Sequence, residues 1–217
     1  MGGKRQTSFY LRSVVAAAAL LAVLTLASPH AAQGYEWRTV TVDAKADVSS
    51  GSIAVDANGD PMISYQDATD SSLKFAICDL SESTNGSCDQ PDDWRTVTVD
   101  AEADVFSGSI AVDANGDPMI SYQDFTNNDL KFAICDRSES TGGNCDQTSD
   151  WSTVTVDAEG SVFRYLFLAL NGSGDPMISY FNSGLKFAIC DRSASANGTC
   201  DQPDDWSTVA LDPAVST

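Results

Sequence analysis

One block of sequence recurs along this chain at a nearly fixed interval. Trp37 and Trp94 each open the run W-R-T-V-T-V-D-A, Trp151 opens W-S-T-V-T-V-D-A, and Trp206 opens W-S-T-V-A-L-D. The tryptophans lie 57, 57 and 55 residues apart, and 46 of 57 positions are identical between 37–93 and 94–150. A period near 50 residues is typical of chains built from repeated structural units. The sequence therefore divides into repeats 37–93, 94–150 and 151–205 and a partial copy, 206–217.

Each repeat contains short runs that are rich in β-branched residues and punctuated by Asp, Asn, Gly and Ser. This pattern predicts strands and leaves no room for an amphipathic helix. Asn58-Gly59 predicts a tight hairpin of type I′ between the second and third runs. In the first repeat the predicted strands are Trp37–Asp43, Ser52–Ala57, Pro61–Tyr65 and Leu73–Cys78.

Four antiparallel strands per repeat predict an all-β, propeller-like array. If the run from Ser52 is the inner strand of a blade, the next tryptophan run is its outer strand. The chain then holds three complete four-stranded blades and one extra N-terminal strand, Trp37–Asp43. Since closed propellers have at least four blades, three outcomes stay open: a homodimer that completes a six-bladed ring, pairing of the extra strand across the gap, or a longer array of which this is a part.

The six cysteines form three C-x9-C pairs, each at the same place in its repeat. An even count with repeat-locked spacing predicts three local disulfides rather than a metal site. The predicted pairs are Cys78–Cys88, Cys135–Cys145 and Cys190–Cys200.

The first 32 residues differ from the rest: a basic start precedes an apolar, alanine-rich stretch and small residues. This is the pattern of a secretory signal peptide, with cleavage expected near Ala27 or Ala32. We therefore expect a secreted protein, extracellular or periplasmic, that is not held in a membrane after cleavage. The chain carries a formal net charge of −19, which disfavours nucleic acid as a partner. The one histidine, His30, lies outside the repeats, which removes the commonest general base from them.

The run S-I-A-V-D-A-N-G-D-P-M-I-S-Y-Q-D…L-K-F-A resembles the repeats of secreted bacterial β-propeller proteins, and it is distantly similar to the Asp-box-type repeats of sialidase-like propellers. The resemblance covers Trp37 to Asp212. It implies a propeller fold, and sialidase-like glycoside hydrolysis as one activity. The run has the aspartate and turn glycine of the Asp-box pattern S-x-D-x-G-x-T-W, but not its T-W.

Two groups of polar residues are candidate sites. Oxygen ligands alternate in D-A-N-G-D as they do at the start of a calcium loop, although Gly and the distal acid are misplaced; the alternative is a capped hairpin turn. The calcium candidates are Asp56, Asn58, Asp60, Asp113, Asn115 and Asp117, and calcium is the one cofactor the sequence leaves open. Tyrosines beside amides could bind a sugar, or pack within blades; these are Tyr65, Gln66, Tyr122, Gln123 and Tyr180.

No catalytic residue is assigned, because every acid in the predicted strands recurs in at least two repeats, as structural residues do. The favoured function is a secreted, non-enzymatic binding or scaffold module for an unknown carbohydrate or protein ligand. A sialidase-like hydrolase and a calcium-stabilised surface module are the alternatives. Tyr165 and Phe167 replace Ser50 and Ser52 of the first repeat, so the third repeat is where we expect a partner surface or a capping blade.

Overall fold

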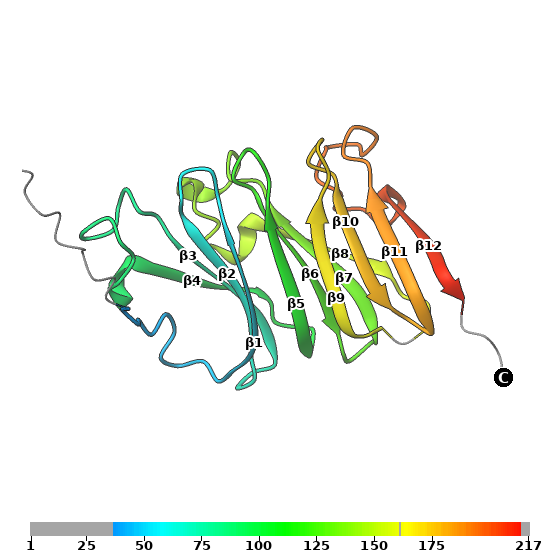
Figure 1. Cartoon of the computed structure of the whole chain (residues 1–217), viewed down its shortest axis with the longest axis horizontal. Coiled ribbons are helices and arrows are strands. Elements are labelled where there is room, and N and C mark those ends of the chain that lie inside the picture. Colours follow the sequence, from blue (N-terminus) through cyan, green and yellow to red (C-terminus); the bar gives the residue numbers. More distant parts are fainter. Residues whose placement is uncertain (1–36, 161, 214–217) are drawn as a thin grey trace, which may run out of the picture. The chain divides into compact units, whose positions relative to one another are not determined.

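A computed structural model describes residues 37–160 and 162–213 of the chain. The predicted signal peptide, 1–32, lies outside the described residues. The fold is all-β, and the unit from Arg38 onward contains twelve described strands in three four-stranded antiparallel sheets, which we call blades 1 to 3 (Figure 1). Blade 1 consists of β1 (Val48–Val55), β2 (Pro61–Asp67), β3 (Ser72–Cys78) and β4 (Trp94–Asp100). Blade 2 consists of β5 (Val105–Val112), β6 (Pro118–Asp124), β7 (Asp129–Cys135) and β8 (Trp151–Asp157). Blade 3 consists of β9 (Phe163–Leu170), β10 (Pro176–Phe181), β11 (Gly184–Cys190) and β12 (Trp206–Pro213).

The expected blade phase is confirmed: each sheet runs from an inner strand to an outer strand that starts at a repeat tryptophan. The expected bounds were a few residues off, since β1 starts at Val48 rather than Ser52. Short 3-10 turns precede the outer strands and complete the described elements: η1 (Pro91–Asp93), η2 (Thr141–Gly143), η3 (Thr148–Asp150) and η4 (Pro203–Asp205).

The extra strand predicted at Trp37–Asp43 is wrong: the first described strand is β1. The other three copies of this run are paired with the third strand of their own blade, as Cys78 is with Trp94. In the described structure, residues 38–43 pair with no strand of the three sheets. A strand-like sequence without a hydrogen-bonding neighbour does not form a sheet.

The hairpin between β1 and β2 also differs from the prediction. A type I′ turn needs positive φ at two residues, but of Asn58 and Gly59 only Gly59 has one, at 93°. The N–H of Gly59 donates to the carbonyl of Asp56, and the N–H of Asp56 pairs with the carbonyl of Asp60. This is the three-residue loop in which a turn is followed by one left-handed residue.

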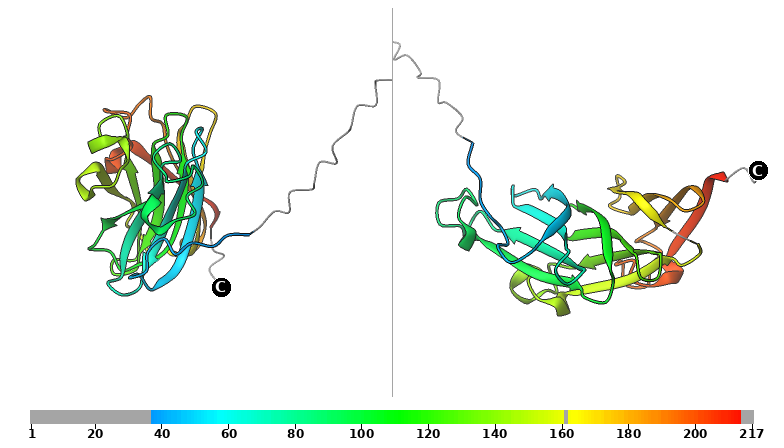
Figure 2. Two further views of the ribbon diagram at one scale, coloured as in Figure 1. Left: turned by 90° about the vertical axis from the view of Figure 1, so that its left-hand side faces the viewer. Right: turned by 90° about the horizontal axis from the view of Figure 1, so that it is seen from below.

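The three blades follow one another in chain order, with their inner strands side by side (Figure 2). The amide of Ile110 in β5 donates to Ser52 Oγ in β1 at 3.3 Å, and the amide of Leu168 in β9 donates to Ser109 Oγ in β5 at 3.1 Å. One apolar cluster joins blade 1 to blade 2 and a second joins blade 2 to blade 3. The core therefore consists of two junctions between blades.

Each junction is made by two unlike blade faces. We call the face that packs on the following blade the front face; in blade 1 it carries Met62, Leu73, Phe75 and Ile77. We call the face that packs on the preceding blade the rear face; in blade 2 it carries Ile110, Ile120, Tyr122 and Trp151. The edge of Phe75 meets the Trp151 ring at a centroid distance of 4.9 Å, and Phe132 meets Trp206 in the same way.

Candidate functional site

The three predicted disulfides are present. Cys78–Cys88, Cys135–Cys145 and Cys190–Cys200 each link the end of a third strand to the loop before the outer strand. In every blade the indole N–H of the tryptophan donates to the carbonyl of the second cysteine at 3.0 Å. The disulfide loop and the tryptophan that enters the junction are therefore held together.

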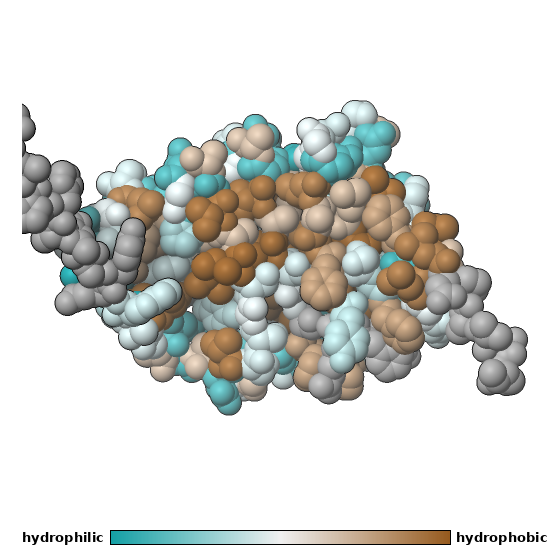
Figure 3. Space-filling view, viewed as in Figure 1, coloured by the Kyte–Doolittle hydropathy of each residue, from teal (hydrophilic) through white to brown (hydrophobic). Residues whose placement is uncertain are grey.

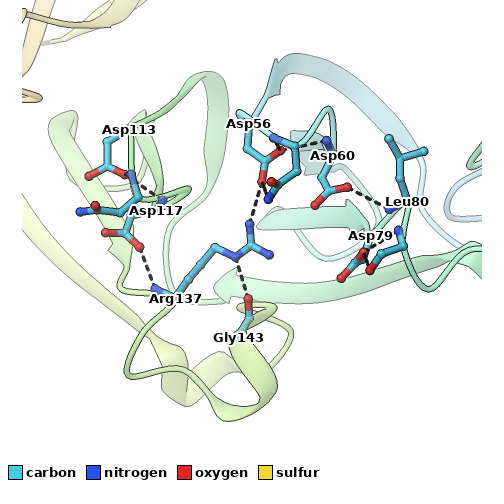
Figure 4. A network of polar contacts seen from close by, with 11 residues as sticks. Asp56, Asp60, Asp79, Leu80, Asp113, Asp117, Arg137 and Gly143 are labelled. Carbon is cyan, nitrogen blue, oxygen red and sulfur yellow. Dashed lines mark hydrogen bonds and ion pairs between the residues drawn. The ribbon is translucent and has the colours of Figure 1, made fainter. Parts of the chain in front are cut away.

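The first polar network connects the turns of neighbouring blades (Figure 4). Asp56 Oδ1 accepts hydrogen bonds from the amides of Asn58 and Asp60, at 2.8 and 2.9 Å. Its second oxygen, Oδ2, accepts a 2.9 Å bond from Nη1 of Arg137 in blade 2, whose Nε donates to the carbonyl of Gly143. One carboxylate thus caps its own turn and binds the next blade.

The second junction repeats this arrangement, because Arg192 of blade 3 binds Asp113 of blade 2 at 2.5 Å. The Asp113 side chain also accepts the amides of Asn115 and Asp117. Aspartate and arginine therefore pair across both blade junctions, although about 80 residues separate the partners in sequence.

The predicted calcium residues are used for these contacts. Asp60 Oδ1 accepts the amide of Leu80, and Asp117 Oδ1 accepts the amide of Arg137, both at 2.9 Å. Asn58 Nδ2 donates to Asp56. In the described part of the chain no three acidic, histidine or cysteine side chains are grouped to hold a metal ion. The geometry supports the capped hairpin turn as the role of these residues.

The second network is a Tyr–Asp–Lys triad in each blade. The hydroxyl of Tyr122 donates to Asp100 Oδ2 at 2.7 Å, and Nζ of Lys131 donates to the same oxygen at 2.5 Å. Asp100 ends β4 of blade 1, whereas the other two residues belong to blade 2. Tyr180, Asp157 and Lys186 form the same triad between blades 2 and 3. In blade 1 the arrangement is looser: Asp43 accepts the Tyr65 hydroxyl at 3.0 Å, whereas Nζ of Lys74 lies 3.8 Å from Asp43 and 2.6 Å from Asp67.

The triads shift the pKa values of their aspartates and tyrosines. Burial by itself would raise the pKa of Asp100, but hydrogen bonds from Lys131 and Tyr122 outweigh burial and hold that pKa below its ordinary value. The pKa of Asp157 is lowered by the same balance. Burial, together with the neighbouring carboxylate, raises the pKa of Tyr122 well above that of a free tyrosine. The aspartates therefore stay ionised and the tyrosines stay neutral near pH 7.

The residues predicted to contact a sugar are all buried. Tyr65, Tyr122 and Tyr180 are members of the triads. Gln66 accepts a hydrogen bond from Ser49, and Gln123 donates to the carbonyl of Val162 at 2.5 Å. These side chains are buried and hydrogen-bonded to groups of the chain itself, so they offer a ligand no exposed surface.

Sequence reasoning missed an aromatic pair that belongs to blade 2 alone. Phe106 and Phe125 lie 6.5 Å apart between ring centroids, and Phe125 is 51% exposed. The corresponding residues of blade 1 are Ser49 and Ala68, and blade 3 has a shorter loop here. These two positions are among the 11 that differ between the first two repeats, which is the signal that could have identified them.

A larger non-repeating feature is the front face of blade 3. Tyr165 and Phe167, which the sequence marked for a partner surface or a capping blade, are exposed on the inner strand of this face. The outer strand adds Val209, which is 51% exposed, whereas its counterpart Val154 is 6% exposed. Hydrophobic surface forms a band across β1, β5 and β9 and reappears over β11 and β12 (Figure 3).

Within the described residues no helix has the length and apolar character of a membrane span.

Comparisons with known proteins identify no family, since no family model and no curated protein sequence matches the chain. Among solved structures, the chain is similar to a fucose lectin from Kordia zhangzhouensis, solved with methyl-fucoside. The identity is 12% and the TM-score 0.44, over 75% of this chain and 99% of the lectin. It is also similar to the intramolecular trans-sialidase from Ruminococcus gnavus, solved with oseltamivir carboxylate. The identity is 15% and the TM-score 0.40, over 85% of this chain and 37% of that enzyme.

Proposed function

We propose that this chain is an exported, non-enzymatic binding or scaffold module with a carbohydrate or protein ligand. The signal-peptide pattern and the three disulfides support export, because disulfides persist in oxidising compartments. The triads and the turn network support a structural rather than catalytic role for the repeated acids. Their carboxylates already accept hydrogen bonds from backbone amides, lysines and arginines of neighbouring blades.

One observation carries the proposal. The repeated polar groups of the triads and turns are engaged within the fold, whereas several exposed aromatic side chains stand at positions where the repeat is broken. Phe125 of blade 2 and Tyr165 and Phe167 of blade 3 are of this kind. Exposed apolar side chains that gather on one part of a soluble domain mark binding surfaces.

For a carbohydrate ligand, the contact we favour is the aromatic pair of blade 2. Aromatic faces stack against the apolar faces of sugar rings. Phe125 is half exposed beside Phe106. The pair occurs in one blade only, so it would give a single sugar site instead of one per repeat.

The test is a glycan array followed by titration of the best glycan. Phe125→Ala is expected to weaken binding about five- to tenfold, since loss of one stacking contact is worth about 1–1.5 kcal/mol. Thr126→Ala, a change at the exposed neighbouring residue, is the matched control and should bind as the parent protein does. A silent array together with no protein partner in pull-downs would count against a binding module. Turnover of aryl glycosides would establish the hydrolase instead.

A further inference from the structure

The two internal junctions show how one blade accepts the next. In both, a phenylalanine of the front face meets a tryptophan of the rear face at 4.9 Å. Both also contain the Asp–Arg pair between turns and the carboxylate that reaches the next blade's tyrosine and lysine. A front face and a rear face of this chain are therefore complementary, and the complementarity is realised twice within one molecule.

The described unit also presents one face of each kind that no blade covers. On the rear face of blade 1, Ile53 is 65% exposed, whereas its counterpart Ile110 is 6% exposed. On the front face of blade 3, Leu185 and Leu211 are exposed where blade 1 has the buried Leu73 and Val99. Phe187 holds the position of Phe75 and Phe132, and Trp94 holds the position of Trp151 and Trp206. Each end thus carries one half of a junction.

The charges at the two ends have changed together. The arginine that reaches back to the preceding blade, Arg137 or Arg192, is replaced in blade 1 by Leu80. The aspartate that receives it, Asp56 or Asp113, is replaced in blade 3 by Asn171. On surfaces that stay in water, neither charge would carry a penalty. If positions 80 and 171 are in buried contact, a charge at only one of them would be buried without a partner, which is costly. The two charges must therefore be present together or absent together, and here both are absent.

The segment before blade 1 marks where a preceding blade belongs. Arg38 pairs with Asp89 as Arg95 pairs with Asp146, and Asp43 accepts the Tyr65 hydroxyl as Asp100 accepts that of Tyr122. The segment 38–43 therefore lies against blade 1 as β4 lies against blade 2. It holds the same repeat positions as β12. When the third blade of another copy docks here, either its β12 displaces this segment or this segment takes the place of that β12.

We propose that a second copy of this chain covers both end faces. Blade 3 of each copy packs its front face on the rear face of the other copy's blade 1, with Leu80 opposite Asn171. Two three-bladed units joined in this way form a closed ring of six blades, within the range of four to eight that propellers use. This assembly goes beyond the proposed function, because it does not depend on the identity of the ligand.

The first test is the solution mass of the oxidised protein, measured by light scattering and sedimentation equilibrium. We expect a dimer. Val209→Glu on blade 3 and Ile53→Glu on blade 1 should each raise the dimer dissociation constant at least about a hundredfold, since each buries an unpaired charge at both seams. Thr208→Glu is the matched control. Its counterpart Thr153 stays exposed in the internal junction, so this variant should remain dimeric.

The second test is a double-mutant cycle between positions 80 and 171. Leu80→Arg and Asn171→Asp should each weaken the dimer about tenfold, and the double variant should recover most of that loss because it rebuilds the ion pair of the internal junctions. Such coupling has no route in a monomer, where the two positions belong to blades that are not neighbours. A parent protein that is monomeric, an open series of increasing masses, or additive effects at these two positions would overturn the proposal.

Discussion

At the scale of single residues, this chain stabilises its blade junctions with carboxylates that have several partners each. Asp100 accepts Tyr122, Lys131 and two backbone amides, and Asp56 caps its turn while binding Arg137. A buried carboxylate is tolerated only when such partners replace its hydration. The aspartates that sequence reasoning offered to calcium are used in the same way, by turns and blade junctions.

The triads make stability dependent on acid. Because the pKa of Asp100 and of Asp157 is lower in the folded state, their contribution is present above the ordinary aspartate pKa of about 4 and is lost as pH falls below it. Asp100→Asn should cost about 2–3 kcal/mol at pH 7, and its deficit relative to the parent should shrink toward pH 3. Thermal unfolding across this range measures both; Asp204→Asn, at an exposed turn, should follow the parent curve.

The Asp56–Arg137 pair can be tested with the residues that the chain itself uses at its ends. Arg137→Leu should destabilise the protein by about 2 kcal/mol, because it leaves the buried Asp56 carboxylate without its cation. Adding Asp56→Asn recreates the Leu80 and Asn171 combination and should restore at least half of the loss. Chemical denaturation of the single and double variants supplies the comparison; strict additivity would show that the two side chains are not coupled.

At the scale of the element, a blade is a four-stranded sheet whose outer strand is tied back by a disulfide. The second cysteine of each pair has positive φ, from 54° to 58°, and its carbonyl accepts the tryptophan indole. A long polar loop thereby delivers the tryptophan to its place in the rear face. The same loop in all three blades explains why cysteine spacing and tryptophan spacing repeat together.

The three disulfides should not be equivalent. Cys135 and Cys145 belong to the cluster between blades 1 and 2, whereas Cys78 and Cys88 lie in blade 1, whose rear face meets no described blade. Replacing Cys78 and Cys88 by Ser should cost about 3 kcal/mol from the loop they close. Replacing Cys135 and Cys145 should cost more, since junction packing is lost as well. Urea unfolding under non-reducing conditions compares the two variants, and equal losses would contradict the difference.

At the scale of the whole molecule, blades 1 and 3 differ from blade 2 because, within the described residues, each has one face on which no other blade packs. Blade 2 is covered on both sides, and every residue of β6 is buried. A propeller-like array removes such end faces only by closing. The further copy that we infer would give Ile53 and Val209 the surroundings that Ile110 and Val154 already have.

Association of two such copies should respond to salt in an unusual direction. Each chain has a formal net charge of −19, and the seam has lost the ion pair of the internal junctions. Screening at high ionic strength should therefore reduce repulsion between copies and tighten the dimer. The measurement is sedimentation equilibrium at about 50 and 500 mM NaCl, between which the Debye length falls from above about 10 Å to below about 8 Å. A dimer that weakens with salt would indicate that ion pairs hold the seam.

The repeat alone was enough to predict an all-β array, the strand order within a blade and the three disulfides. These features depend on local alternation and on spacing, which sequence records directly. Tertiary structure alone decided that Asp100 would meet Tyr122 of the next blade, that Asp56 would meet Arg137, and that the Trp37 run would lack a ladder. Those outcomes depend on which blade lies beside which, and strand periodicity contains no information about neighbours across a junction.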